Sequence, residues 1–363
     1  MSRRLLIARP GHIYLATYNS ASATITIDLD EPFPGNPSWF TASPTDPDLL
    51  YTSDERGSTT YAFRLDLEAN TLTKVARSED GSKGVCHLAF NKEGTIMIGT
   101  SWAEGTIDIW NTESSTPKLI TTIQSKDPVV DAGRVARAHE AVLDPTGRFF
   151  IVNDLGTDSL LVLDALRPDV PVVRRATVPS GSGPRHGVFY PAGEGKKATH
   201  YFLLCETTNR VEVFKLKYTE VDIEVTPAGG CCTFVDEDVG AFAAAGEIML
   251  SKDGHVYTSN RLMTTPTETI SHFRVKPEGD EGELELELVG ETSTQGKHPR
   301  MFSLSRDENE LFVGNQEGEW AVVVLRRRED GTLEEKPVAG VLMEDIVKGG
   351  GDEIGPKFVL EVV

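Results

Sequence analysis

Residues suited to proton transfer and anion binding recur at similar places along this sequence. They stand where short apolar runs begin or end, and they are His87, His139, Glu140, Asp154, Arg185, His186, Glu206, Glu247, Arg261 and Arg300. Histidine is the side chain most readily poised near neutral pH to accept or donate a proton. Arginine binds a carboxylate or a phosphate through two parallel hydrogen bonds. Together these residue types predict a site for acid–base chemistry on an anionic small molecule.

These residues recur because the chain itself repeats at intervals of about fifty residues. Each copy reads as a short apolar strand, a polar turn that often carries Asp-Gly or Pro-x-Gly, and two further strands. The copies begin near Ser38, Cys86, His139, Arg185, Gly246 and Arg300. Runs of about four to seven residues rich in Val, Ile, Phe, Tyr and Thr are typical of β-strands. A repeat of this length with about four strands indicates the blade of a β-propeller.

The two ends of the chain lie outside these six copies. The segments His12–Tyr18 and Thr24–Asp28 predict two strands, and Lys357–Val362 predicts one more. Together they predict a seventh blade that both termini complete, which leaves no open edge on the ring. Six or eight blades are the alternatives. The segments Val221–Ala244 and Val341–Gly355 are predicted to be irregular insertions.

We therefore expect an all-β fold, a seven-bladed β-propeller of four-stranded antiparallel blades, as a single domain over residues 1–363. In a propeller the first strand of each blade lines the central channel, and the loops that enter these strands gather at one face. Buried arginine and glutamate are costly unless they are paired. Several of them at equivalent repeat positions predict a polar, water-accessible pocket. The alternative is a set of ion pairs that hold neighbouring blades together.

Short motifs in six repeats carry a family resemblance. In chain order they are RAHEAVLDP at Arg137–Pro145 with NDLG at Asn153–Gly156, GPRH at Gly183–His186, Glu206–Asn209, AGEI at Ala245–Ile248 with SNR at Ser259–Arg261, and HPR at His298–Arg300. Their order and spacing resemble the lactonase family of seven-bladed propellers. That family includes bacterial 6-phosphogluconolactonases and fungal 3-carboxy-cis,cis-muconate lactonizing enzymes.

The resemblance implies an active site of one histidine, two arginines and one glutamate, which match His139, Arg185, Arg261 and Glu206. We expect His139 to act as general base or general acid. A glutamate beside two arginines stays ionised, which favours a role for Glu206 in orienting its neighbours over a second acid–base role. Structural ion pairs, and a histidine bonded only to the backbone, are the alternative interpretations.

The two arginines are expected to bind the anionic group of a substrate, or to stabilise an oxyanion or enolate as it forms. A second set of residues is predicted to contact the substrate, and its members are His186, Glu247, Arg300, His87 and Asp154. The alternative roles of Asp154 are to cap a turn or to hold a neighbouring arginine.

No metal or other cofactor is predicted. The sequence has no His-Glu-x-x-His zinc spacing and no Gly-x-Ser-x-Gly nucleophile motif. Glu247, Asp154 and Asn260 could contribute to a calcium site of the kind found in gluconolactonase propellers, but the arginines close to them in the repeats argue against it.

Composition excludes several other classes of partner. The chain has 36 Lys and Arg against 56 Asp and Glu, a formal net charge of -20, so the basic face of a nucleic-acid binder is not expected. No apolar run approaches the ~18 residues of a membrane-spanning helix. The four cysteines, Cys86, Cys205, Cys231 and Cys232, match no disulfide or zinc pattern, which favours a reduced, cytoplasmic location.

The leading hypothesis is a metal-independent enzyme of lactone chemistry that acts on an anionic small molecule. Hydrolysis of a sugar lactone of the 6-phosphogluconolactone kind and lactonizing cycloisomerisation of a muconate-type diacid both remain open. One alternative is a cyclase or isomerase of specialised metabolism. Another is a non-catalytic, protein-binding propeller, although the Gly-His and Trp-Asp pairs of such repeats are missing. The oligomeric state is left open.

Overall fold

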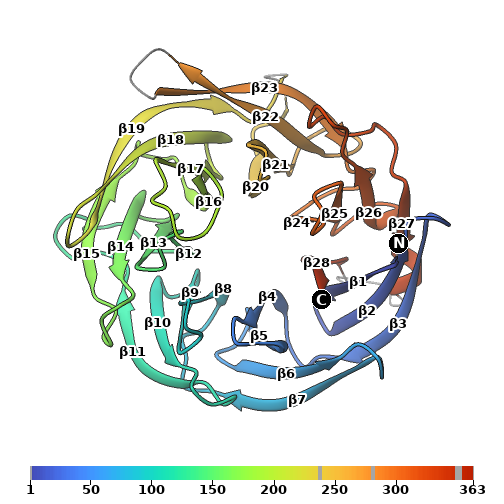
Figure 1. The fold of residues 1–363 in the computed structure, drawn as a ribbon, viewed down its shortest axis with the longest axis horizontal. Helices are drawn as coiled ribbons and strands as arrows, with labels where there is room; N and C mark the ends of the chain where they lie inside the picture. The colour runs from blue at the N-terminus through green and yellow to red at the C-terminus, as the bar shows by residue number, and fades with distance from the viewer. Residues whose placement is uncertain (1, 236–238, 279–282, 348–353, 363) are drawn as a thin grey trace. The chain divides into compact units, whose positions relative to one another are not determined.

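The structure, a computed structural model, describes residues 2–235, 239–278, 283–347 and 354–362. Within them the chain forms seven four-stranded sheets and one short helix, α1 (Met343–Ile346) (Figure 1). This is the sheet content of a seven-bladed β-propeller, so the predicted fold class is confirmed. Contacts divide the chain into two compact units, which we describe in turn. The expectation of a single domain stays a prediction.

Unit 2 comprises Ser38–Asp66 and Thr71–Gly229. Apart from end residues of β4 and β19, it contains four sheets of consecutive strands, β4 to β7, β8 to β11, β12 to β15 and β16 to β19. The strands are β4 (Pro37–Ser43), β5 (Asp46–Asp54), β6 (Thr60–Asp66), β7 (Thr71–Ser78), β8 (Val85–Phe90), β9 (Ile96–Ser101), β10 (Thr106–Asn111), β11 (Lys118–Gln124), β12 (Ala138–Leu143), β13 (Phe149–Asp154), β14 (Ser159–Asp164), β15 (Val172–Thr177), β16 (Pro184–Tyr190), β17 (His200–Cys205), β18 (Arg210–Tyr218) and β19 (Ile223–Cys232).

Unit 1 comprises Met1–Pro37, Leu67–Asn70 and Gly230–Val363. Its three sheets have the orders β28-β1-β2-β3, β20-β21-β22-β23 and β24-β25-β26-β27. The strands are β1 (Ser2–Arg9), β2 (His12–Asn19), β3 (Thr24–Pro32), β20 (Ala244–Leu250), β21 (His255–Arg261), β22 (Thr269–Glu278), β23 (Glu283–Ser293), β24 (Met301–Leu304), β25 (Glu310–Gly314), β26 (Trp320–Arg326), β27 (Ala339–Leu342) and β28 (Phe358–Val362).

Both termini complete one sheet, as the sequence predicts, because β28 pairs antiparallel with β1 in the register Leu6↔Leu360. The six predicted repeat starts each lie within two residues of a first strand. Three details of the prediction are wrong. Ser2–Arg9 is a strand, β1, that the sequence analysis did not assign. Val221–Ala244 contains β19, and Val341–Gly355 contains the end of β27 and α1, with residues 348–353 outside the described part.

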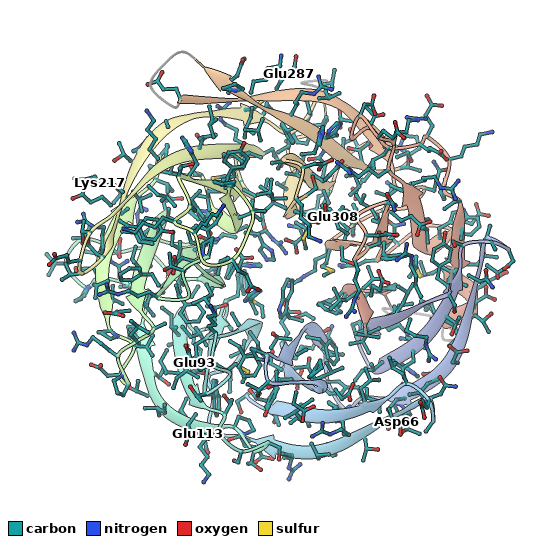
Figure 2. The ribbon with its side chains drawn as sticks, in the orientation of Figure 1. Asp66, Glu93, Glu113, Lys217, Glu287 and Glu308 are labelled. Carbon is teal, nitrogen blue, oxygen red and sulfur yellow. The ribbon has the colours of Figure 1, made fainter. Side chains whose placement is uncertain are left out.

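Burial follows the position of each strand within its sheet. Every residue of β13 and β14 is buried, whereas the outer strand β11 alternates between exposed and half-buried residues. Continuous apolar runs suit strands covered on both faces, and alternation suits strands with one face in water. Phe149, Leu203 and Phe214 pack together between the β12–β15 and β16–β19 sheets. Charged side chains such as Lys217 are exposed on outer strands (Figure 2).

Three of the four first strands of unit 2 share an irregularity at their start. Pairing of β8 with β9, of β12 with β13 and of β16 with β17 skips one residue of the first strand. The extra residues are Cys86, His139 and Arg185. Such β-bulges re-aim a side chain and are enriched beside functional sites. In unit 1, β20 has a comparable shift between Ala245 and Ile248.

Two histidines of unit 1 form a hydrogen-bonded pair inside the β20–β23 sheet. His255 Nδ1 and His272 Nε2 are 2.8 Å apart, and the ring of His272 is stacked on Tyr257. Burial, with the charges of His255, Arg274 and Arg327, lowers the pKa of His272 to about 4. Burial also lowers the pKa of His255, although Asp253 opposes the shift. Both rings are therefore neutral in the folded protein at pH 7.

This pair predicts an acid-sensitive fold. The unfolded chain takes up a proton on His272 near the usual pKa of 6.5, whereas the folded chain does so near 4. Stability is therefore complete above pH 6.5 and falls as the pH drops towards 4, with a loss of about 2 kcal/mol from His272 by pH 5. Urea denaturation at pH 7.5 and pH 5 measures this loss. The variant His272→Phe should show a smaller loss than the parent, and an equal loss would contradict the assignment.

Candidate active site

Polar side chains of four neighbouring first strands meet in unit 2. The residues that follow the bulges, together with one residue of β4 and two of second strands, form what we call the Glu140 cluster, whose members are Trp39, His87, Glu140, Asn153, His186 and Tyr201. His87, Glu140, Asn153, His186 and Tyr201 are buried, and Trp39 is half-buried. The repeat thus brings together residues that are up to about 160 positions apart in the sequence.

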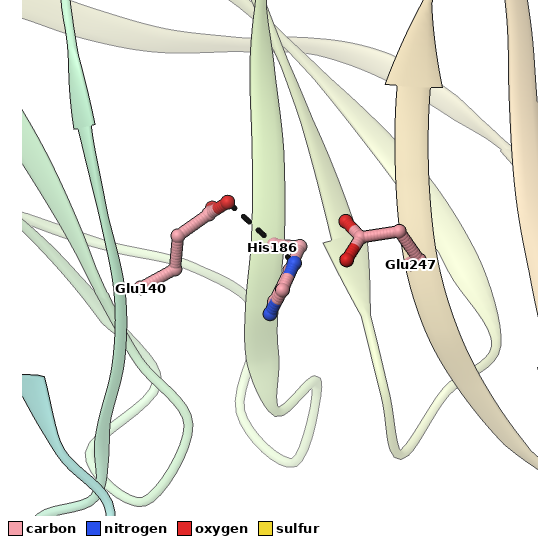
Figure 3. Close-up of side chains that lie close together, drawn as sticks. All are labelled: Glu140, His186 and Glu247. Atoms are coloured by element: carbon pink, nitrogen blue, oxygen red, sulfur yellow. Dashed lines mark ion pairs between the residues drawn. The ribbon is translucent and has the colours of Figure 1, made fainter. Parts of the chain in front are cut away.

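Glu140 on β12 is the central carboxylate of the cluster. Its Oε2 accepts hydrogen bonds from Asn153 Nδ2 at 2.9 Å and from the backbone N–H of Gly187 at 2.7 Å. Its Oε1 lies 3.5 Å from His186 Nδ1 (Figure 3) and 3.9 Å from His87 Nε2. A carboxylate at this distance can orient an imidazole ring and select its tautomer.

A chain of hydrogen bonds from Tyr201 through Asn153 holds the Glu140 carboxylate in place. Tyr201 donates its hydroxyl proton to Asn153 Oδ1 at 3.0 Å, so Asn153 presents its amide N–H to Glu140. Burial, helped by the charge of Glu140, raises the pKa of Tyr201 well above its usual value, so the phenol stays a donor. A side chain at Gly187 would collide with the Tyr201 ring, because an added Cβ would lie 2.3 Å from its hydroxyl oxygen.

His87 is a neutral partner in the cluster. Burial, with the charges of His186 and Arg185, holds its pKa well below the usual value. Its ring centroid lies 4.2 Å from that of Trp39, and Trp39 also contacts His186 edge-on at 5.7 Å. A neutral imidazole can accept and donate hydrogen bonds without adding charge, which suits a supporting position.

His139 lies beside this cluster at its bulge on β12. Its ring centroid is 5.0 Å from that of His186. Its carbonyl oxygen accepts a hydrogen bond from Thr100 Oγ1 at 2.9 Å, and Cys86 Sγ approaches the same oxygen at 3.3 Å. The backbone of the bulge is therefore held by the neighbouring sheet. The structure thus brings His186 within contact of both His139 and His87, and the roles predicted for the three histidines stay predictions.

Arg185 and Glu206 form the second part of the site. Arg185 occupies the bulge of β16, and its Nε lies 2.9 Å from Glu206 Oε2. The arginine side chain is 2% exposed and the glutamate side chain 29% exposed. Glu206 follows the end of β17, where its backbone N–H donates to Gly183 O at 2.8 Å. The pair therefore extends from the protein interior towards solvent, with its carboxylate within reach of a small molecule.

The carboxylate of Asp154 is occupied by hydrogen bonds within the protein. It is fully buried, and its Oδ1 accepts hydrogen bonds from the backbone N–H groups of Arg137, Gly156 and Thr157, each at 2.9 Å. Its Oδ2 accepts from Ser125 Oγ. These contacts agree with the turn-cap alternative of the sequence analysis. A contact between Asp154 and a substrate stays a prediction.

The remaining predicted site residues belong to unit 1. Glu247 is buried in the irregular start of β20, and its Oε1 accepts the backbone N–H of Ile248 at 3.0 Å. Arg261 ends β21 and donates from Nη2 to Ala245 O at 2.9 Å. Arg300 precedes β24, with its backbone N–H bonded to His298 O. The roles predicted for these three residues stay predictions.

Comparison with known proteins decides the family. Residues 6–341 match the family model described as a lactonase with a 7-bladed beta-propeller. This chain belongs to the lactonase family of seven-bladed β-propellers. The lactonase-family chain is 29% identical over 261 residues to a probable 6-phosphogluconolactonase of Arthroderma benhamiae, a match that spans 69% of this chain and 64% of the fungal relative. The matched region therefore covers slightly less than two thirds of the fungal relative's length.

Solved structures show the same fold. A periplasmic gluconolactonase of Pseudomonas aeruginosa has a TM-score of 0.81 at 19% identity, covering 100% of this chain and 99% of that one. A putative 6-phosphogluconolactonase of Bacteroides fragilis has a TM-score of 0.75 at 21% identity, covering 94% and 98%. No helix among the described residues is long and apolar enough to span a membrane.

From the sequence alone, Glu140 stands at a repeat start without a predicted role, and neither Trp39 nor Tyr201 is among the predicted site residues. Trp39 occupies the same place in its repeat, after Ser38, as His87 does after Cys86, so repeat alignment could have found it. Tyr201 carries no such signal, because it stands within an apolar strand. Glu140 and His186 also offer the ligand types of a zinc site, which makes a chelator part of any functional test.

Proposed function

We propose that this lactonase-family chain hydrolyses the ring ester of a sugar lactone without a metal ion, with His139 and Arg185 as the reacting groups and Glu206 as the carboxylate that orients Arg185. The observation that carries the proposal is the ion pair between a buried Arg185 and a partly exposed Glu206. It stands beside three histidines and the carboxylate of Glu140, which β8, β12 and β16 bring together. The family relationship and the fungal relative named as a probable 6-phosphogluconolactonase support the reaction class.

In this mechanism a water molecule attacks the lactone carbonyl carbon while His139 takes a proton from that water. The carbonyl oxygen becomes an oxyanion, which the guanidinium of Arg185 stabilises. The bond between that carbon and the ring oxygen then breaks, and the imidazolium of His139 returns its proton to the ring oxygen. The product is the ring-opened hydroxy acid, which is the lactone plus one water molecule, and His139 returns to its starting protonation state. Glu206 holds the planar fork of Arg185 in one orientation.

Turnover by the purified protein tests the proposal directly. The substrates are glucono-δ-lactone, 6-phosphogluconolactone and a muconate-type diacid, each corrected for its spontaneous reaction, with and without EDTA. We expect lactone hydrolysis that survives EDTA and falls about 100-fold or more in His139→Ala, because a general base contributes roughly that factor. Arg261→Ala tests the role that the family resemblance gives that residue.

Other results would contradict specific parts of the proposal. Loss of turnover with EDTA, restored by zinc, would replace the metal-free mechanism by a metal-dependent one. Turnover of the diacid alone would replace hydrolysis by cycloisomerisation. No turnover of any substrate by folded protein would overturn the enzyme assignment.

A further inference from the structure

A cation is held over an aromatic ring where the chain enters β12. The guanidinium carbon of Arg137 lies 3.7 Å from the ring centroid of Trp102, and Arg137 Nη1 donates to Trp102 O at 3.2 Å. Trp102 is 42% exposed. Stacking on an aromatic face fixes a guanidinium plane while leaving its remaining N–H donors directed away from the ring.

Arg137 differs from the other arginines around it in its electrostatic partners. Eight arginines lie between residues 131 and 210, and seven of them form ion pairs, namely Arg134, Arg148, Arg167, Arg174, Arg175, Arg185 and Arg210. Arg137 forms no ion pair with any carboxylate in the described parts of the chain. In a protein with a net charge of -20, a half-exposed cation without a carboxylate partner is available to an anionic ligand.

Equivalent backbone hydrogen bonds place Arg137 at a special position of the repeat. Trp102 N–H donates to Gly84 O, Leu155 N–H to Arg137 O, and Glu206 N–H to Gly183 O. Arg137 therefore occupies the position that Gly84 and Gly183 occupy in the two neighbouring sheets. Trp102 corresponds in its sheet to Glu206, the proposed active-site carboxylate. The two residues thus lie at the strand ends that carry the proposed site in unit 2.

The backbone around Arg137 is fixed. Its N–H donates to Asp154 Oδ1 at 2.9 Å, and its carbonyl oxygen accepts from Leu155 N–H at 3.0 Å. Gly156 allows this close packing, because an added Cβ would lie 1.8 Å from Val135 O and 3.1 Å from Arg137 Cγ. The guanidinium is therefore held in place before any ligand arrives, which lowers the entropic cost of binding.

We propose that Arg137, stacked on Trp102, binds the anionic group of the substrate at a point remote from the reacting carbonyl, and so selects lactones that carry a phosphate or a carboxylate. The inference rests on the proposed lactone hydrolysis and adds to it the residue that recognises the charged substituent of the substrate. Arg185 is committed to Glu206 and to the oxyanion, so a separate cation is needed for a charged substituent. Arg137 supplies that cation with a geometry suited to bidentate contact.

The test compares kcat/KM for three lactones in the parent and in Arg137→Gln. They are glucono-δ-lactone, which is neutral, 6-phosphogluconolactone, which carries a phosphate, and the lactone of glucaric acid, which carries a carboxylate. The ratio of kcat/KM for a charged lactone to that for the neutral one should fall about tenfold or more, because a hydrogen bond to a charged group contributes roughly that factor. The charged lactone with the larger fall identifies the preferred anion.

Arg167→Gln is the matched control. It removes the same charge from the other end of the β12–β15 sheet, where Arg167 pairs with Asp169, and should leave the ratios unchanged. Unaltered ratios in Arg137→Gln, with turnover intact, overturn the inference and leave the proposed function standing. If no lactone is hydrolysed, the proposed function fails. In that case, calorimetry measures the binding of 6-phosphogluconate to the parent and to Arg137→Gln. Loss of binding in the variant supports an anion subsite at Arg137, and equal binding overturns it.

Discussion

The variant Arg185→Lys is expected to lower kcat/KM for lactone hydrolysis by about 100-fold to 1000-fold, the range seen when one oxyanion donor is removed. Lysine keeps the positive charge but lacks the Nε that lies 2.9 Å from Glu206 Oε2, so the fixed planar donor is lost. Because the charge is retained beside Glu206, the thermal midpoint should change little. Steady-state kinetics and a melting curve measure the two effects.

Arg210→Lys is the matched control for this variant. Arg210 lies in the same sheet and has the same kind of contact, with its Nε 3.0 Å from Glu212 Oε1, but its side chain is far more exposed. We expect no loss of turnover from this change. If Arg185→Lys is as active as Arg210→Lys, the Arg185–Glu206 pair is a structural link between strands and the proposed mechanism loses its oxyanion group.

The variant Glu140→Ala is expected to destabilise the protein by about 3 kcal/mol, because it strands buried donors that each cost roughly 1–3 kcal/mol when unsatisfied. Those donors are Asn153 Nδ2 and the N–H of Gly187. Urea denaturation measures the loss. Glu140→Gln keeps an acceptor oxygen for both donors, so it should recover most of the stability while removing the charge that faces His186.

Glu93→Ala provides the comparison, since Glu93 Oε2 accepts from Asn91 Nδ2 at 3.1 Å in the turn between β8 and β9. The hydrogen bond is of the same type, but Glu93 is exposed, so its loss should cost within about 0.5 kcal/mol. Equal destabilisation by Glu140→Ala and Glu93→Ala would show that the Glu140 cluster does not hold the first strands together.

The pH dependence of turnover separates two roles for Glu140. If its carboxylate orients His186 and supports protonation of the neighbouring imidazoles, Glu140→Gln should shift the acidic limb of the kcat/KM profile to lower pH. A carboxylate that only holds the backbone would leave the profile in place. This readout distinguishes a positioning residue from a structural one.

The repeat length, the strand-rich composition and the turn residues determined the fold class and the closure of one sheet by both termini. They were sufficient because each blade is a local unit whose strands pair with their sequence neighbours, so the pattern of one copy predicts the next. Strand β1 was missed because its charged start, Ser2-Arg3-Arg4, hid the strand pattern. Its arginines are held by distant partners, such as Glu310 for Arg3, which no local pattern reveals.

The residue types of the site were also readable from the sequence, because they recur at repeat starts. Their geometry was not. The bulges that re-aim His139 and Arg185 depend on register with the following strand, and the orientation of Glu140 depends on Tyr201, an apolar-looking position about sixty residues away. Sequence periodicity predicted which polar residues stand at the repeat starts, and only packing between sheets decided which of them are paired, neutral or, within the described part of the chain, without a carboxylate partner, as Arg137 is.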